Sequence, residues 1–309
     1  MRDQFKRYVR AIVPPRIIYR VQTARGSVMS RAARAAFEGA SSKPKWLDPK
    51  LISVLQRRYP LGWGYHSDPT KSLWLQGAER ARQMKPFLPM GHPRTLELAC
   101  YDAMVSYQLA QKGARAFALD IRADYVDPRA RDAGVYFVGS NAEHLPFEDN
   151  SFDFVFSYNA FEHFSDPQTV FAEALRAVRP GGVLYFRFGP LYRSAFGLHA
   201  MHCVTVPFCQ HLFERSAIEE YVTTCQLERI EFETLNEWTL QQFRDLWDER
   251  RPWAEKLLYR EIPDVQGLDL ICEYPSCFRS KTDNFEDLLL ATIEIAFRRT
   301  DRSLSLIHI

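Results

Sequence analysis

The sequence has no pair of cysteines at the two-residue spacing of redox and zinc motifs, and no apolar run of the roughly 18 residues that cross a bilayer. Its six cysteines are spread along the chain, which indicates reduced thiols and a cytoplasmic protein. Residues 1–30 also lack a continuous apolar stretch followed by a small-residue cleavage site. We therefore expect no secretory signal.

The sequence also has no large excess of positive or negative residues, since its formal net charge is only +2. Residues 1–36 nevertheless hold nine Arg or Lys and one acid, Asp3, so the rest of the chain is mildly acidic. Such a body has no strong attraction for a phosphate backbone, and no nucleic-acid partner is expected. Residues 1–45 are interpreted as a basic arm and linker. Its residues 5–13 fit a basic amphipathic helix, which can lie on the inner membrane surface or can be solvated or packed on the body.

Residues 46–92 have a helical pattern that is interrupted at residues 59–69 by a turn cluster rich in Gly, Pro and aromatics. We interpret this segment as a helical and aromatic preamble to the main domain. Trp63, Tyr65 and Trp74 could line the mouth of a site, although large aromatic side chains more often belong to a core.

The stretch from Thr95 to Asp120 predicts a strand, a turn, a helix and a second strand that ends on a carboxylate. Further strands are expected at residues 135–138, 152–157 and 182–188, with a helix at 167–178. Strands that alternate with helices imply a parallel sheet covered on both faces, with its ligand at the carboxyl ends of the strands. Two late alternating segments, 227–234 and 293–298, are expected to pair.

The predicted fold class is therefore α/β: a Rossmann-like seven-stranded sheet whose last two strands form an antiparallel pair, with an N-terminal helical arm and a helical cap. The main domain is expected to span residues 93–303, with the cap at about 236–288, because that segment is too long for a simple loop. The last residues, 304–309, read LSLIHI and resemble the translation of a transposon-end adapter used for sequencing libraries. We expect this tail to be non-native and the true C-terminus to be missing.

Residues 139–182 carry the short motifs LPF, SFD, EH and RAVRPGG in this order. With the strand pattern of residues 93–190, they resemble the class I S-adenosylmethionine-dependent methyltransferases, in particular the type 11 family. The resemblance implies S-adenosylmethionine as the cofactor. The turn after the first strand, ACYDAM, lacks the G-x-G-x-x-G of nicotinamide enzymes. SYNAF after the fourth strand lacks the Asn/Asp-Pro-Pro-aromatic motif usual for adenine or amide methylation.

The resemblance also implies roles for individual residues. Glu97 would face the methionine amino group, and Asp120, with Ile121 beside it, would bind the ribose hydroxyls. The other expected cofactor-binding residues lie beneath the ligand or border its adenine or methionine moiety; they are Ala99, Cys100, Tyr101, Asn141, Ala142, Glu143, Ser157, Tyr158 and Asn159. The family usually has glycines in the first turn, where this chain has Ala99, Tyr101 and Ala103, and a tyrosine at a positive φ would be strained.

Methyl transfer to a hydroxyl requires removal of its proton, for which a histidine or carboxylate is suited. His163, six positions after the fourth strand, is the first choice, with Glu162 beside it to orient the ring. His199 is the second choice, and His202 and His211 are further candidates; for any single histidine a packing role remains open. His199 and His202 with Cys203 and Cys209 match no common zinc spacing, so no metal is expected.

The sequence thus predicts a methyltransferase that acts on oxygen in a small molecule or a glycan precursor. The segment GPLYRSAFGLHA is similar to one in a bacterial subgroup of the family, some members of which are linked to surface sugars. Two alternatives stay open: a non-catalytic scaffold that binds the cofactor, and a membrane-surface adaptor that uses the basic arm through residues 1–36. The acceptor and the oligomeric state do not follow from the sequence.

Overall fold

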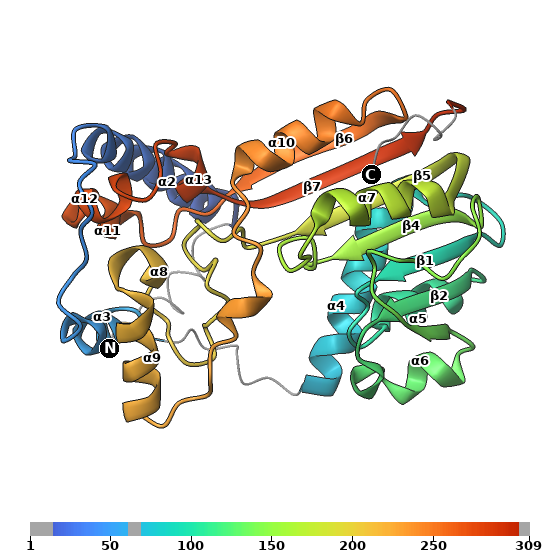
Figure 1. Ribbon diagram of the computed structural model, residues 1–309, viewed down its shortest axis with the longest axis horizontal. Helices are drawn as coiled ribbons and strands as arrows, with labels where there is room; N and C mark the ends of the chain where they lie inside the picture. The colour runs from blue at the N-terminus through green and yellow to red at the C-terminus, as the bar shows by residue number, and fades with distance from the viewer. Residues whose placement is uncertain (1–14, 61–68, 303–309) are drawn as a thin grey trace.

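The computed structural model describes residues 15–60 and 69–302. Within them, seven strands form one sheet in the order β3-β2-β1-β4-β5-β7-β6 (Figure 1). The parallel strands are β1 (Arg94–Leu98), β2 (Arg115–Asp120), β3 (Tyr136–Gly139), β4 (Phe152–Tyr158) and β5 (Val178–Phe188). The antiparallel pair is β6 (Ala254–Pro263) and β7 (Leu290–Arg299). The predicted fold class is confirmed.

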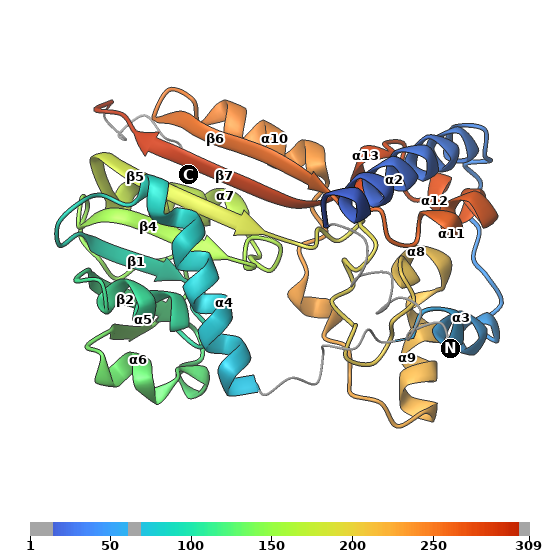
Figure 2. The same ribbon diagram turned by 180° about the vertical axis from the view of Figure 1, so that it is seen from behind.

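Helices cover both faces of the sheet because its central strands are apolar on both sides. On one face lie α4 (Pro69–Met84) and α5 (Met104–Ala110), and Figure 2 shows α4 running across the strands. On the other face α7 (Pro167–Ala177) and α10 (Leu240–Glu249) bury an aromatic core against β5 and β7. The short elements η1 (Lys85–Phe87), η2 (Ala123–Tyr125) and α6 (Pro128–Asp132) complete this part. We call it the sheet lobe.

A second hydrophobic core lies beside the sheet lobe, in a group of helices that we call the helical lobe, residues 15–60, 189–235 and 264–289. Figures 1 and 2 both show it at the end of the molecule where β7 begins, before that strand runs into the sheet. Its elements are α2 (Pro15–Glu38), α3 (Leu51–Arg58), α8 (Cys209–Leu212), α9 (Arg215–Thr224), η3 (Phe232–Thr234), α11 (Leu268–Glu273), α12 (Pro275–Arg279) and α13 (Glu286–Leu289). The arm is part of this core, since Phe37 of α2 is buried against Phe285 with ring centroids 5.7 Å apart.

The position predicted for the sixth strand was wrong. Residues 227–234 form no strand and end in η3, whereas β6 spans Ala254–Pro263 and pairs with β7. The polar residues of the alternating pattern at 227–234 are exposed to solvent instead of lining a strand. Two of them, Arg229 and Glu233, form an ion pair at 3.6 Å. In β6 the register shifts between Lys256 and Leu258, so the expected period of two is broken at the sheet edge.

Residues 236–288, expected as a helical cap, consequently contain helices of both lobes and β6 between them. α10 packs on the sheet, while α11 and α12 contact α2. The segment is therefore not one contiguous helical layer.

Three sequence-based expectations lie outside the described residues: the amphipathic helix at 5–13, the aromatic residues Trp63 and Tyr65, and the tail 304–309. Trp74 is described and lies on α4, where it is 41% exposed. None of the described helices is long and apolar enough to cross a membrane.

Candidate active site

The turn after β1 holds three non-glycine residues in the left-handed region, with φ of 51° at Ala99, 48° at Tyr101 and 57° at Ala103. These are the positions at which the resemblance described above implied glycine, and their backbone has the positive φ that glycine adopts most readily. The conformation costs roughly 1–2 kcal/mol per L-residue. Tyr101 directs its ring outward against Tyr125, with centroids 4.6 Å apart, so the side chain leaves the turn open.

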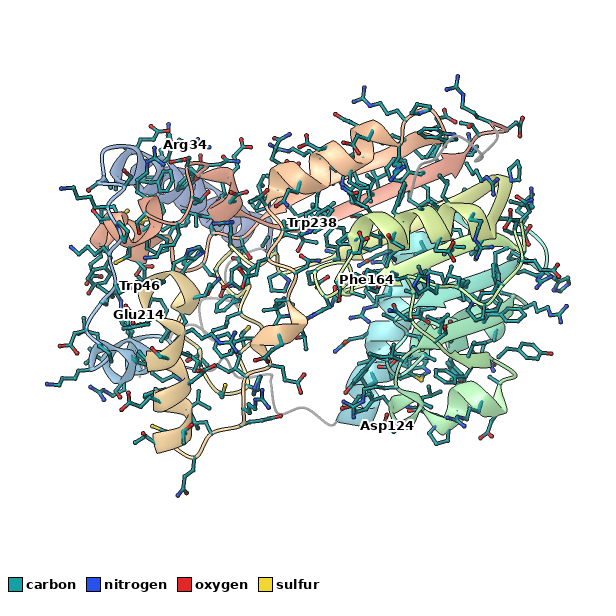
Figure 3. The ribbon with its side chains drawn as sticks, viewed as in Figure 1. Arg34, Trp46, Asp124, Phe164, Glu214 and Trp238 are labelled. Carbon is teal, nitrogen blue, oxygen red and sulfur yellow. The ribbon has the colours of Figure 1, made fainter. Side chains whose placement is uncertain are left out.

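A cavity of about 240 Å³ opens at the carboxyl ends of the parallel strands. Seven of the residues predicted from the sequence line it: Ala99, Asp120, Ile121, Asn141, Ala142, Glu143 and His163. Leu119, Ser140, Ala160, Phe164 and Ser165 complete the lining. Figure 3 places Phe164 at the edge of the sheet lobe that faces the helical lobe, near Trp238. The cavity therefore reaches toward the junction of the lobes.

Asp120 ends β2 at this cavity, and its two oxygens are held by backbone donors. Oδ2 accepts from the Tyr101 amide at 2.8 Å and Oδ1 from the Arg122 amide at 3.0 Å. A carboxylate has about four lone-pair directions, so both oxygens keep acceptor capacity toward a vicinal diol. The acceptor oxygens of Asp120 and the apolar Ile121 and Ala142 fit the ribose and adenine of a nucleoside.

Glu97 is 3% exposed, and its Oε2 accepts from the Ser106 amide at 3.0 Å and from the Ser106 hydroxyl at 2.6 Å. Burial raises the pKa of this carboxyl to about 8, and the nearby Asp102 adds to the increase. A buried carboxyl with this pKa is suited to a cationic ligand, because a neighbouring positive charge restores its ionised form.

The other predicted cofactor residues do not line the cavity. Cys100 is buried, and burial raises the pKa of its thiol. The Ser157 hydroxyl donates to the Leu98 carbonyl at 2.9 Å, and the Tyr158 hydroxyl donates to the Arg80 carbonyl at 2.9 Å, toward α4. Asn159 follows β4 with a φ of 48°. Cofactor contacts of these residues and of Tyr101 remain predictions.

Sequence reasoning missed Arg80, which α4 brings to the same region. Burial raises the pKa of the carboxyls of Glu97 and Glu162, and the positive charge of Arg80 opposes part of that increase in both. Its guanidinium lies 5.3 Å from the Tyr158 ring centre and has no hydrogen-bond or ion-pair partner among the described residues. Such a group is available to an anionic ligand. No spacing in the sequence distinguishes this arginine from others of the preamble.

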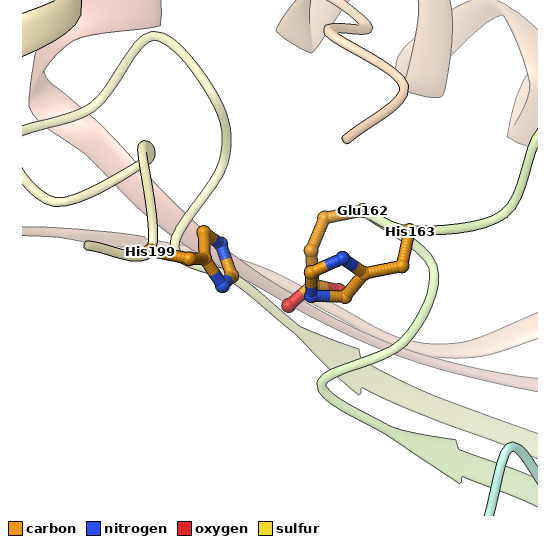
Figure 4. A group of neighbouring side chains, drawn as sticks. All are labelled: Glu162, His163 and His199. Atoms are coloured by element: carbon orange, nitrogen blue, oxygen red, sulfur yellow. The ribbon is translucent and has the colours of Figure 1, made fainter. Parts of the chain in front are cut away.

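Glu162, His163 and His199 form a cluster beside the cavity, shown in Figure 4, with one ligand-type atom of each within 4.8 Å of the others. The His163 and His199 rings meet edge to face at 4.8 Å. The structure thus brings together the first and second choices for the catalytic base and the carboxylate expected beside them. His202 is exposed, and His211 is buried in the helical lobe, where burial lowers its pKa to about 3.

Each member of this cluster is anchored by backbone. His163 Nδ1 lies 2.9 Å from the Thr234 carbonyl and His199 Nε2 lies 2.8 Å from the Pro190 carbonyl, so these nitrogens donate. Glu162 Oε1 accepts from the Gly189 amide at 3.0 Å, while Oε2 is buried without a partner. Burial raises the pKa of Glu162 and lowers that of His199 to about 4. The cluster can accept a proton or a cation.

A family model described as a methyltransferase domain matches residues 96–186, which include the first turn, Asp120 and the cluster residues Glu162 and His163. The demethylmenaquinone methyltransferase of Clavibacter sepedonicus is 30% identical over 175 residues, which cover 54% of this chain and 69% of that protein. The chain belongs to the class I S-adenosylmethionine-dependent methyltransferases of the type 11 family. It is a methyltransferase, and its cofactor is S-adenosylmethionine.

Other relatives share less identity. The phthiotriol/phenolphthiotriol dimycocerosates methyltransferase of Mycobacterium tuberculosis is 26% identical over 230 residues, 68% of this chain and 78% of that protein. Among solved structures, the geranyl diphosphate C-methyltransferase of Streptomyces coelicolor has a TM-score of 0.47 at 13% identity, and the alignment covers 78% of this chain and 87% of that one. The YcgJ protein of Bacillus subtilis has a TM-score of 0.46 at 16% identity, covering 74% and 100%.

Proposed function

We propose that this methyltransferase acts on a hydroxyl oxygen of a small molecule or glycan precursor, which enters at the junction of the two lobes. The observation that carries the proposal is the cluster of Glu162, His163 and His199 beside the cofactor cavity, with lone pairs that a hydroxyl proton can reach. The relatives' names describe a quinone precursor and lipids as acceptors, which supports a hydrophobic small molecule. The similarity of residues 189–200 to a segment of methyltransferases linked to surface sugars supports a glycan precursor as the alternative acceptor.

The placement of the cofactor-binding residues supports the roles proposed for them. Asp120 binds the ribose hydroxyls, and Asn141, Ala142 and Glu143 border the adenine. Glu97 pairs with the methionine amino group, and Arg80 is the cation placed to pair with the methionine carboxylate. When bound, S-adenosylmethionine supplies an electrophilic methyl group whose bond to sulfur breaks as the bond to the acceptor's oxygen forms.

The chain's own residues align the acceptor and remove its proton. Alignment and exclusion of water dominate in this reaction, because charge is lost rather than formed as the two reactants combine. His163 lines the cavity and is the first choice to receive the proton, with its orientation fixed by the Thr234 carbonyl and by Glu162. His199, across from it, is the second choice.

The proposed binding of the cofactor's ribose is tested by a substitution at Asp120. Replacement by alanine removes the acceptors for both ribose hydroxyls, and each charged hydrogen bond is worth about 1.5–3 kcal/mol. We expect Asp120→Ala to weaken S-adenosylhomocysteine binding by at least about tenfold in isothermal titration calorimetry. Asp124→Ala is the matched control, since Asp124 lies four positions on and pairs with Arg122 in solvent. Equal affinity of the two variants would contradict the assignment.

The basic arm is proposed to bring the enzyme to an anionic membrane surface, which would suit a lipid-soluble acceptor. In the described part of the arm, Arg31 is exposed, as are Val28 and Met29 at 59% and 40%. We expect the protein to co-sediment with phosphatidylglycerol vesicles and not with phosphatidylcholine vesicles, and Arg31→Glu to weaken this binding. Equal binding to both lipids would remove the electrostatic argument.

A further inference from the structure

Removing a proton from the molecule that receives the methyl group requires only one basic side chain. The cluster of Glu162, His163 and His199 instead brings three side chains with lone pairs together. A backbone carbonyl only accepts, so His163 carries its proton on Nδ1 toward Thr234, and His199 carries its proton on Nε2 toward Pro190. The opposite nitrogens, His163 Nε2 and His199 Nδ1, therefore carry lone pairs. Glu162 Oε2 adds a buried oxygen without a partner.

One ligand-type atom of each of the three residues lies within 4.8 Å of the others, and Glu162 Oε2 is buried without a hydrogen-bond partner. A buried acceptor that has lost water without gaining a donor is costly, on the order of 1–3 kcal/mol and more for a charged group. A cation shared by the three side chains would satisfy this Glu162 oxygen and would also use the lone pairs of both rings. A metal-bound histidine typically donates its other ring N–H to a carbonyl or carboxylate, which is the arrangement of both rings here.

We propose that Glu162, His163 and His199 bind one divalent transition-metal ion of the zinc class, with an open coordination position that faces the acceptor. Two imidazoles and a carboxylate are a common three-ligand set for catalytic zinc, whose fourth position is left to water or substrate. Ligand atoms around such an ion lie roughly 3.4 Å apart for bonds of about 2.1 Å. Ligand atoms that lie up to 4.8 Å apart must therefore move closer together on binding, and His199 lies in an irregular segment between β5 and α8.

The ion's role rests on the proposed O-methylation, whereas its binding does not. A hydroxyl bound at the open position has its pKa lowered by the ion and releases its proton to water, so His163 then acts as a ligand. Spacing in the sequence does not reveal the site, because His199 comes from the helical lobe, 36 positions after His163.

The test uses the full chain after treatment with a chelator, titrated with cobalt(II), whose visible absorption reports low-coordinate nitrogen and oxygen ligation. We expect one cobalt(II) per chain. Glu162→Gln and His199→Gln should weaken its binding by more than the roughly 10–100-fold that loss of an outer partner costs. His202→Gln is the control, because His202 is exposed and outside the cluster.

S-adenosylhomocysteine titration of each variant shows whether it is folded and tests the proposed function separately. Cofactor binding without cobalt(II) binding would overturn the metal site and leave the methyltransferase proposal intact, and the cluster would then share a proton between Glu162 and His163. Cobalt(II) binding that is unchanged in both variants would also overturn the assignment. Cobalt(II) binding together with methyl transfer to an atom other than oxygen would leave the metal site and remove the proposed O-methylation.

Discussion

Replacement of His163 by glutamine is expected to lower the turnover number by about 10²–10⁴ and to leave S-adenosylhomocysteine affinity unchanged. Glutamine is similar in size, but its amide is neither a base nor a good ligand for zinc-class ions, so the acceptor's proton is no longer removed. Turnover is measured with radiolabelled methyl donor and an acceptor found by screening hydroxylated quinones, lipids and sugars. Cofactor affinity is measured by calorimetry on the same preparation.

The same assay on two further variants locates the group that matters. His202→Gln should behave like the unchanged protein, because its side chain is exposed and outside the cluster. Full turnover in His163→Gln together with loss in His199→Gln would show that the proton-removing group lies on the segment after β5. Full turnover in both variants would place proton removal elsewhere.

Cofactor affinity is expected to depend steeply on pH because of Glu97. In the free protein burial raises the pKa of this carboxyl to about 8 from an ordinary value of 4.5, whereas an ammonium group beside it requires the carboxylate. Below about pH 8 binding must therefore release a proton, so affinity should rise about tenfold per pH unit. Between about pH 6 and pH 8 this amounts to roughly 100-fold, measured by calorimetry with S-adenosylhomocysteine in two buffers of different ionisation enthalpy.

The Glu97→Gln variant is the control for this dependence. It should bind weakly at all pH values between about 6 and 8, with the slope largely removed. The pH dependence of folding stability is a second test of the raised pKa of Glu97, and its direction can be predicted. Because the folded-state pKa lies above the unfolded value, stability is highest below about pH 4.5 as far as this group is concerned and falls as the pH rises toward about 8. A pH-independent affinity of the unchanged protein would contradict the pairing of Glu97 with the amino group.

The sheet lobe was largely predictable because its local signals agree with its tertiary role. β1, β2, β4 and β5 are apolar segments separated by a helical pattern, and their order along the chain leaves few topologies open. The position of Asp120 and of residues 141–143 beside the cavity was predictable because the carboxyl end of a parallel strand fixes where a polar residue must lie. The edge strand β6 was not, because it pairs on one side only and a register shift breaks its period.

The part of the site that comes from outside the sheet could not be predicted in the same way. Arg80 lies over the Tyr158 ring because α4 crosses the strands, and no local pattern in the sequence encodes that crossing. The pairing of His163 with His199 depends on how the helical lobe docks on the sheet lobe, which involves chain segments far apart in sequence. Each histidine could be proposed as a catalytic base from its residue type alone. That the two rings contact each other could be seen only in the folded structure.

The place of β7 in the sheet has a consequence for synthesis of the protein on the ribosome. β7 is the last strand of the described sheet in chain order, yet it lies between β5 and β6 rather than at an edge. Until residues 290–299 leave the exit tunnel, the nascent chain has an unpaired border on β5 and an unattached β6. Such open borders are templates for association with other chains. The interval before β7 arrives is therefore the time when a growing chain is most exposed to misassembly, and when protection by a chaperone matters most.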